Sequence, residues 1–179
     1  FLRDRTRWSP TARGASRPGP SSSIIPSARN GGLIDAELLV LAHAVPTAAA
    51  AAMALGVCLE SVFKSLVMDA SCSEGVIART GGERRVSARA VSRLLGVSGL
   101  SFTSATRVLD VTGYPAGGVP PFGFPTRLRV AIDDAVWSHD VIYCGGGRPE
   151  CLIRIAPAAL VRASGGIVGA ISLQGRTSR

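Results

Sequence analysis

Residues 60–82 read ESVFKSLVMDASCSEGVIARTGG, and this stretch decides the fold class. Residues 60–68 predict one strand and residues 75–80 predict a second, because both are rich in apolar side chains that suit a pleated, half-buried surface. Gly81 and Gly82 predict the turn that follows the second strand. These two strands are therefore expected to form part of a sheet that the flanking segments extend.

The segment before this stretch predicts two helices. Apolar residues over 34–41 lie near helical spacing, which predicts a helix that ends before Pro46. Thr47 can then cap a short Ala-rich helix that Gly56 closes. The Ala tract is a good helix former and needs no special explanation.

The segment after it mixes helices with strands. Helices are expected over residues 87–96, 104–111 and 157–163, and strands near residues 100–102, 128–132, 141–144, 152–155 and 167–173. About six strands with three to five helices in mixed order predict an α+β fold. We expect a single compact domain around a mixed sheet, over residues 33–175.

The net charge of +8 first suggests a polyanionic partner such as nucleic acid. However, residues 1–32 hold six Arg against one Asp, so most of the charge lies in a segment that predicts a flexible basic leader. This leader is either a transit peptide or the result of a fragmentary sequence. No secretory signal or membrane span is expected, which indicates a cytoplasmic location, or an organellar one if residues 1–32 are a transit peptide.

Several function classes find no support in the sequence. The four cysteines form no C-x-x-C pair and the two histidines have no ligand spacing, so no metal and no other cofactor is expected. There is no G-x-S-x-G motif for a serine nucleophile. Aromatic residues make up 5% of the chain and do not alternate with Arg, as a base-stacking module would require.

Lys64 is the first candidate for a functional residue. Of the 20 basic residues, 19 are Arg, so Lys64 marks a position where a bulky planar guanidinium does not serve. Period-2 alternation places it on one face of its strand with apolar neighbours, where an ammonium needs a carbonyl, an anion or a ligand. An ordinary lysine at a strand end is the alternative interpretation.

Two Gly-rich segments are the other candidates. Within residues 113–125, the run Gly-Gly-Val-Pro-Pro at 117–121 joins residues that permit unusual φ to residues that fix φ. Such a loop is rigid and lets a ligand approach its backbone closely. Residues 145–149 (Gly-Gly-Gly-Arg-Pro) are either a hairpin turn with an incidental Arg or a Gly-rich floor with a phosphate-binding cation, but they are not a P-loop, because the terminal G-K-[ST] is missing.

In this order, the Lys64 strand, the 117–121 loop, the following strand and the 145–149 turn resemble the YbaK/prolyl-tRNA-synthetase-associated domain family. The resemblance covers about residues 34–172. It implies a mixed α/β domain that hydrolyses the ester of a mischarged aminoacyl-tRNA without a metal. Relatives act as separate proteins or as an editing insertion in prolyl-tRNA synthetase, which makes that synthetase a candidate partner.

The resemblance also implies roles for individual residues. Lys64 would hold the carbonyl or phosphate region at the tRNA 3′ end, and the backbone from Gly117 would position the ester. The catalytic candidates are thus Lys64 and Gly117, and the substrate-binding candidates are Thr47, Ser65, Gly118, Val119, Pro120, Pro121, Asp133, Gly146 and Gly147. Pro120 next to Pro121 stiffens the loop and leaves the amino-acid specificity open.

The leading hypothesis is a trans-editing hydrolase of Cys- or Ala-charged tRNA(Pro). One alternative is a non-catalytic module of the same fold that binds an aminoacyl or nucleotide group. Another is a general basic RNA-binding protein whose affinity comes from residues 1–32. A small cavity between Lys64 and the 117–121 loop would favour Ala or Cys over larger side chains.

Overall fold

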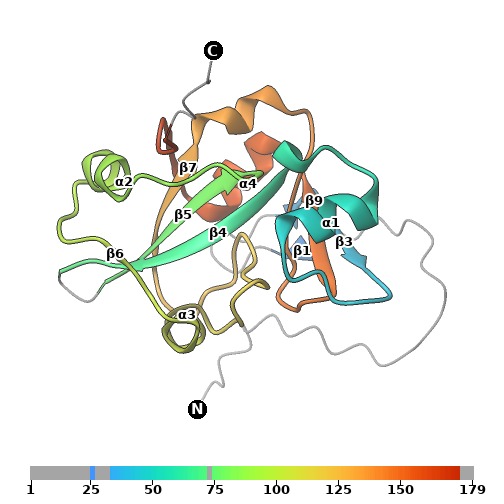
Figure 1. Ribbon diagram of the computed structural model, residues 1–179, viewed down its shortest axis with the longest axis horizontal. Helices are drawn as coiled ribbons and strands as arrows, with labels where there is room; N and C mark the ends of the chain where they lie inside the picture. Colours follow the sequence, from blue (N-terminus) through green and yellow to red (C-terminus); the bar gives the residue numbers. More distant parts are fainter. Residues whose placement is uncertain (1–24, 27–32, 72–73, 174–179) are drawn as a thin grey trace.

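The computed structural model describes residues 25–26, 33–71 and 74–173, and its centre is an eight-stranded mixed sheet (Figure 1). The order across the sheet is β10-β7-β5-β4-β8-β9-β3, and β6 pairs with the far end of β4. The strands are β1 (Ile25–Pro26), β2 (Leu33–Ile34), β3 (Ala36–Val40), β4 (Val62–Asp69), β5 (Gly75–Gly81), β6 (Ser101–Phe102), β7 (Arg129–Asp133), β8 (Ile142–Gly145), β9 (Cys151–Ile155) and β10 (Ile167–Gly169). The helices are α1 (Ala48–Leu55), α2 (Ala88–Leu95), α3 (Ala105–Thr112) and α4 (Pro157–Ser164), with 3₁₀ turns at Leu59–Ser61 and Asp134–Ser138.

The sheet is mixed in direction, as the sequence predicts. β4 pairs antiparallel with β5 and parallel with β8, while β7 lies parallel to both β5 and β10. The α+β class and the single domain with a mixed sheet are confirmed. The strand number is higher than the six expected, partly because β3 adds an edge strand that the sequence analysis did not predict.

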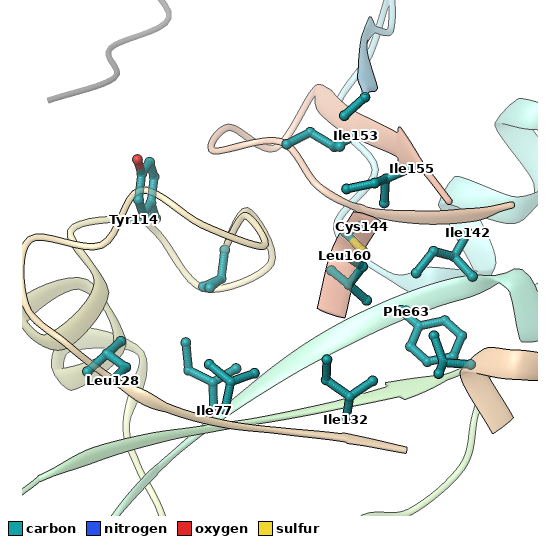
Figure 2. Close-up of a cluster of buried hydrophobic side chains, with 14 of the residues drawn as sticks. Phe63, Ile77, Tyr114, Leu128, Ile132, Ile142, Cys144, Ile153, Ile155 and Leu160 are labelled. Atoms are coloured by element: carbon teal, nitrogen blue, oxygen red, sulfur yellow. The ribbon is translucent and has the colours of Figure 1, made fainter. Parts of the chain in front are cut away.

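The helices cover both faces of the sheet. Val91 and Leu95 of α2 pack on one face, in a cluster with Met68 and Val76. On the other face, α3, α4 and the 117–121 loop enclose the largest cluster, where Figure 2 shows side chains such as Phe63 projecting from the strands into the interior. The alternation of β4 therefore divides its side chains between two cores.

Helix termini in the structure follow the predicted caps. The Thr47 hydroxyl accepts a hydrogen bond from the Ala50 amide, and Gly56 ends α1 in the left-handed region. Ser87 and Gly96 have the same roles in α2. These local signals are reliable because the cap satisfies backbone groups that the helix itself leaves unpaired.

The helix predicted over residues 34–41 is wrong, since Ala36–Val40 forms the edge strand β3, which pairs antiparallel with β9. The leucines of this segment are divided between two cores: Leu38 packs against the cluster around Phe63, whereas Leu39 and Leu41 pack beside α1. A strand covered on both faces has apolar residues in sequence without alternation, which imitates helical spacing.

Two other predictions concern residues 1–32 and membrane-spanning helices. Apart from residues 25–26, the proposed leader over 1–32 lies outside the described residues. Within the described residues, no helix is long and apolar enough to cross a membrane.

Candidate functional site

The candidate site lies where β4 and β8 separate. These two strands pair only at Val62 and Phe63, and just beyond this pairing the Ser65 side chain of β4 contacts the 117–121 loop. A cavity of about 80 Å³ opens here. Its wall consists of residues 45–48 and Ala51 around the start of α1, residues 62–65 of β4, Gly117 and Val119 of the loop, Gly145 and Leu152.

Five of the predicted site residues line this cavity. They come from three separate segments of the chain and are Thr47, Lys64, Ser65, Gly117 and Val119. Lys64 is half-buried and lies in register with Thr80 of β5, on the same face of β4 as Val62. The alternation of the strand thus places an ammonium beside a mainly apolar wall, as the sequence predicts.

Three consecutive carbonyls hold the 117–121 loop to the rest of the domain. The Gly147 amide donates to the Gly118 carbonyl at 2.7 Å. The Ser65 hydroxyl donates to the Val119 carbonyl at 3.4 Å, and the Arg79 guanidinium donates to the Pro120 carbonyl at 2.8 Å. Gly118, Pro120 and Gly147 are not among the residues of the cavity wall, but these bonds fix the loop that contributes Gly117 and Val119 to it.

Glycine is required at two positions around the cavity. Gly117 has φ +86°, a conformation that other L-residues rarely adopt. A Cβ on Gly145 would lie 2.8 Å from the Val119 carbonyl oxygen and 2.9 Å from the Gly118 carbonyl carbon. The end of β8 and the loop can therefore pack this closely only because Gly145 has no side chain.

Arg79 lies behind the cavity and is fully buried. Its Nη1 donates to the Ser65 hydroxyl at 2.7 Å, in addition to the bond from Nη2 to Pro120. Burial lowers the pKa of Arg79 to about 10, so the guanidinium is still charged at neutral pH. Burial also raises the pKa of the nearby Cys144 thiol to about 11, against the opposing influence of the Arg79 cation.

The remaining predicted residues lie outside the cavity wall. The buried Asp133 carboxylate accepts hydrogen bonds from the amides of Ala135 and Ser172, and Arg84 lies 3.8 Å from it. The Gly146 amide donates to the Cys151 carbonyl and closes the β8–β9 turn. Pro121 is buried just beyond the loop carbonyls that are held. These contacts hold the fold around the site, and the substrate-binding role of these residues stays a prediction.

Several lining residues were missed in the sequence. Val45, Pro46 and Leu152 carry no chemical motif, so only the packing of distant segments brings them to the cavity, whereas Gly145 belongs to the Gly-rich candidate segment 145–149. Arg79 did have a signal, since it interrupts the apolar strand VIART. That signal was overlooked because Arg is so frequent in this chain.

A second cavity, of about 430 Å³, lies at the other end of β5 and β7. Arg127, Arg129 and Glu74 are among its lining residues, and Arg129 forms an ion pair with Glu74 at 3.4 Å. None of the predicted site residues lines it. The smaller cavity is therefore the candidate site, because it combines an ammonium group with a rigid backbone wall.

Comparisons with known proteins show which family this chain is similar to. The family model for the aminoacyl-tRNA editing domain matches residues 42–163, a range that contains the whole wall of the smaller cavity. The crystal structure of hypothetical protein APE2540 is 30% identical, with a TM-score of 0.72, and the match covers 77% of this chain and 91% of that one. A protein described as a candidate trans-editing enzyme for prolyl tRNA synthetase is 27% identical, with a TM-score of 0.72 and coverage of 78% and 87%.

Proposed function

This chain belongs to the aminoacyl-tRNA editing domain family, and from that premise we propose that it is a deacylase that hydrolyses Cys- or Ala-charged tRNA(Pro). One observation carries the proposal: Lys64 and the backbone of the 117–121 loop line the same cavity of about 80 Å³. The similar structure of a candidate trans-editing enzyme for prolyl tRNA synthetase supports the tRNA(Pro) specificity and a partnership with prolyl-tRNA synthetase.

The size of the cavity favours a small amino acid. A single water needs roughly 10–15 Å³ of such volume, so the cavity has room for about five to eight waters, which is enough for an alanyl or cysteinyl group. Val45, Ala48 and Ala51 contribute apolar wall on the α1 side. This wall suits a small apolar side chain better than a charged one, because these side chains offer a charge no hydrogen-bond partner.

The proposed chemistry needs few groups, because an aminoacyl ester is already activated. Water attacks the acyl carbon, the bond to the ribose oxygen breaks, and the proton passes to that oxygen, which leaves a free amino acid and an intact tRNA 3′ end. The Lys64 ammonium stabilises the negative charge that develops on the acyl oxygen or binds the adjacent phosphate. The loop backbone from Gly117 holds the ester in place for the attack.

The test measures deacylation of tRNA(Pro) charged with Cys, Ala or Pro. Lys64→Ala is expected to lower kcat by about 10²–10³, the effect of removing one donor from an oxyanion site. Lys64→Arg is expected to fail as well, because the planar fork is larger than the ammonium. Arg162→Ala removes a positive charge from an exposed position on α4 and is the matched control.

One result would count against this function and another against the role given to Lys64. If the wild-type protein binds the charged tRNAs but leaves the lifetime of every ester unchanged, the domain is a binding module and not an enzyme. If Lys64→Arg retains full activity, the explanation of the single lysine is wrong.

A further inference from the structure

Arg79 has a position that stability alone does not explain. It stands in the middle of β5, where every residue is buried. Among the described residues it has no carboxylate partner, and its buried Nε has no hydrogen-bond partner. A buried charge of this kind costs free energy, and a well-packed apolar side chain would usually be more stable.

The two bonds of the guanidinium connect the two walls of the site. Arg79 lies opposite Ser65 in the β4–β5 register, so both side chains project from the same face of the sheet. Nη1 holds the Ser65 hydroxyl, which itself donates to the Val119 carbonyl, and Nη2 holds the Pro120 carbonyl. A closed network thus joins β4, β5 and the loop directly behind the cavity.

We infer that Arg79 is a positioning residue that fixes the distance between β4 and the 117–121 loop, and that this distance sets which acyl side chains the cavity accepts. Its planar fork can hold two acceptors at a fixed angle, which a flexible ammonium cannot do. The inference depends on the proposed deacylase function for its substrate readout. It has a second readout that needs no substrate.

The expected consequence is a loss of size discrimination. A hydrophobic pocket usually discriminates by about 10–200-fold for each methylene. Arg79→Met keeps an unbranched side chain of similar length but removes both donors, so the loop can move away from β4. We expect the preference for alanyl-tRNA(Pro) over valyl-tRNA(Pro) to fall at least tenfold, through a lower kcat for the alanyl ester and a higher kcat/KM for the valyl ester.

The experiment compares three arginine variants with a stability control. Arg79→Lys retains the charge but not the fork, and it should lose discrimination as Arg79→Met does. Arg79→Gln has a shorter side chain with one donor nitrogen in place of Nη1 and Nη2, so it does not reproduce the fork, and it provides the test if the Met variant does not fold. Val91→Ala creates a void under α2 on the opposite face of the sheet, and it should lower stability without changing the alanyl/valyl ratio.

Hydrogen exchange of the folded proteins supplies the second readout. The Gly147 amide, which donates to the Gly118 carbonyl, should exchange faster in Arg79→Met than in wild type or Val91→Ala. If wild type has no deacylase activity, the proposed function fails, and the exchange result still tests whether Arg79 fixes the loop to β4. If Arg79→Lys keeps wild-type discrimination, or if exchange at Gly147 is unchanged in Arg79→Met, the inference is overturned.

Discussion

Gly145→Ala is expected to damage the site by direct steric contact. Gly145 has no left-handed backbone conformation, so the substitution adds a methyl group without backbone strain. That methyl carbon would lie 2.8 Å from the Val119 carbonyl oxygen, whereas ordinary contacts begin at 3.4 Å. The loop must therefore move by about 0.6 Å, and overpacking of this kind typically costs about 1–3 kcal/mol.

The effect on catalysis should exceed the effect on folding. A 1 Å misplacement can cost on the order of 10²-fold in rate, so we expect a loss of about tenfold or more in kcat/KM toward Ala-tRNA(Pro). Gly96→Ala is the matched control, because φ there is +66° and no atom lies near the added carbon. It should lose about 1–2 kcal/mol of stability through backbone strain and keep its activity.

The assay combines urea unfolding with deacylation measured per folded molecule. Wild-type kcat/KM in Gly145→Ala would refute the claim that the loop position controls the reaction. An equal loss of activity in Gly96→Ala would show that general destabilisation, and not the loop, explains the result.

Two further predictions concern buried polar groups. Asp133→Asn should lower the free energy of unfolding in urea by about 1–3 kcal/mol, because its side-chain NH2 group cannot accept one of the two hydrogen bonds that the Ala135 and Ser172 backbone amides donate. A loss of deacylation per folded molecule would instead support the substrate-binding role predicted from the sequence. The Cys144 thiol should resist iodoacetamide at pH 8 while exposed Cys58 reacts, as followed by mass spectrometry, because burial raises the pKa of Cys144 from 9.0 to about 11. Between these two values the unfolded chain loses the thiol proton and the folded chain keeps it, so stability should fall as pH rises from about 9 to 10. Above pH 10 the lowered pKa of Arg79 acts in the opposite direction. No fall in stability between pH 9 and 10 would contradict this prediction.

The parts of the fold that could be predicted depend on local chemistry. Thr47, Ser87 and Ser104 were recognisable as helix starts because a short polar side chain satisfies the first free amides. The β4–β5 pair was recognisable from two apolar runs. In contrast, β3 was mistaken for a helix. Its partner β9 lies more than 100 residues later in the chain, so the local sequence pattern does not show that residues 36–40 pair with another strand.

The candidate site was predictable only where a residue is unusual for its surroundings. Lys64 was conspicuous because the chain otherwise uses Arg, and Gly117 because it stands in a Gly/Pro loop. Leu152 and Val45 are ordinary apolar residues, so their place in the cavity follows from tertiary packing alone. Arg79 needed knowledge of its burial, since an arginine in a basic chain is normally a surface residue.

The cavity draws its wall from residues as far apart as Val45 and Leu152. During synthesis from the N-terminus, β4 and β5 can pair early, but the β8–β9 hairpin that supplies Gly145 and Leu152 arrives much later. Contacts so distant in sequence form late in folding. A nascent chain therefore has no complete cavity wall until nearly all of these residues have been made, so the proposed site forms only when the domain is almost finished.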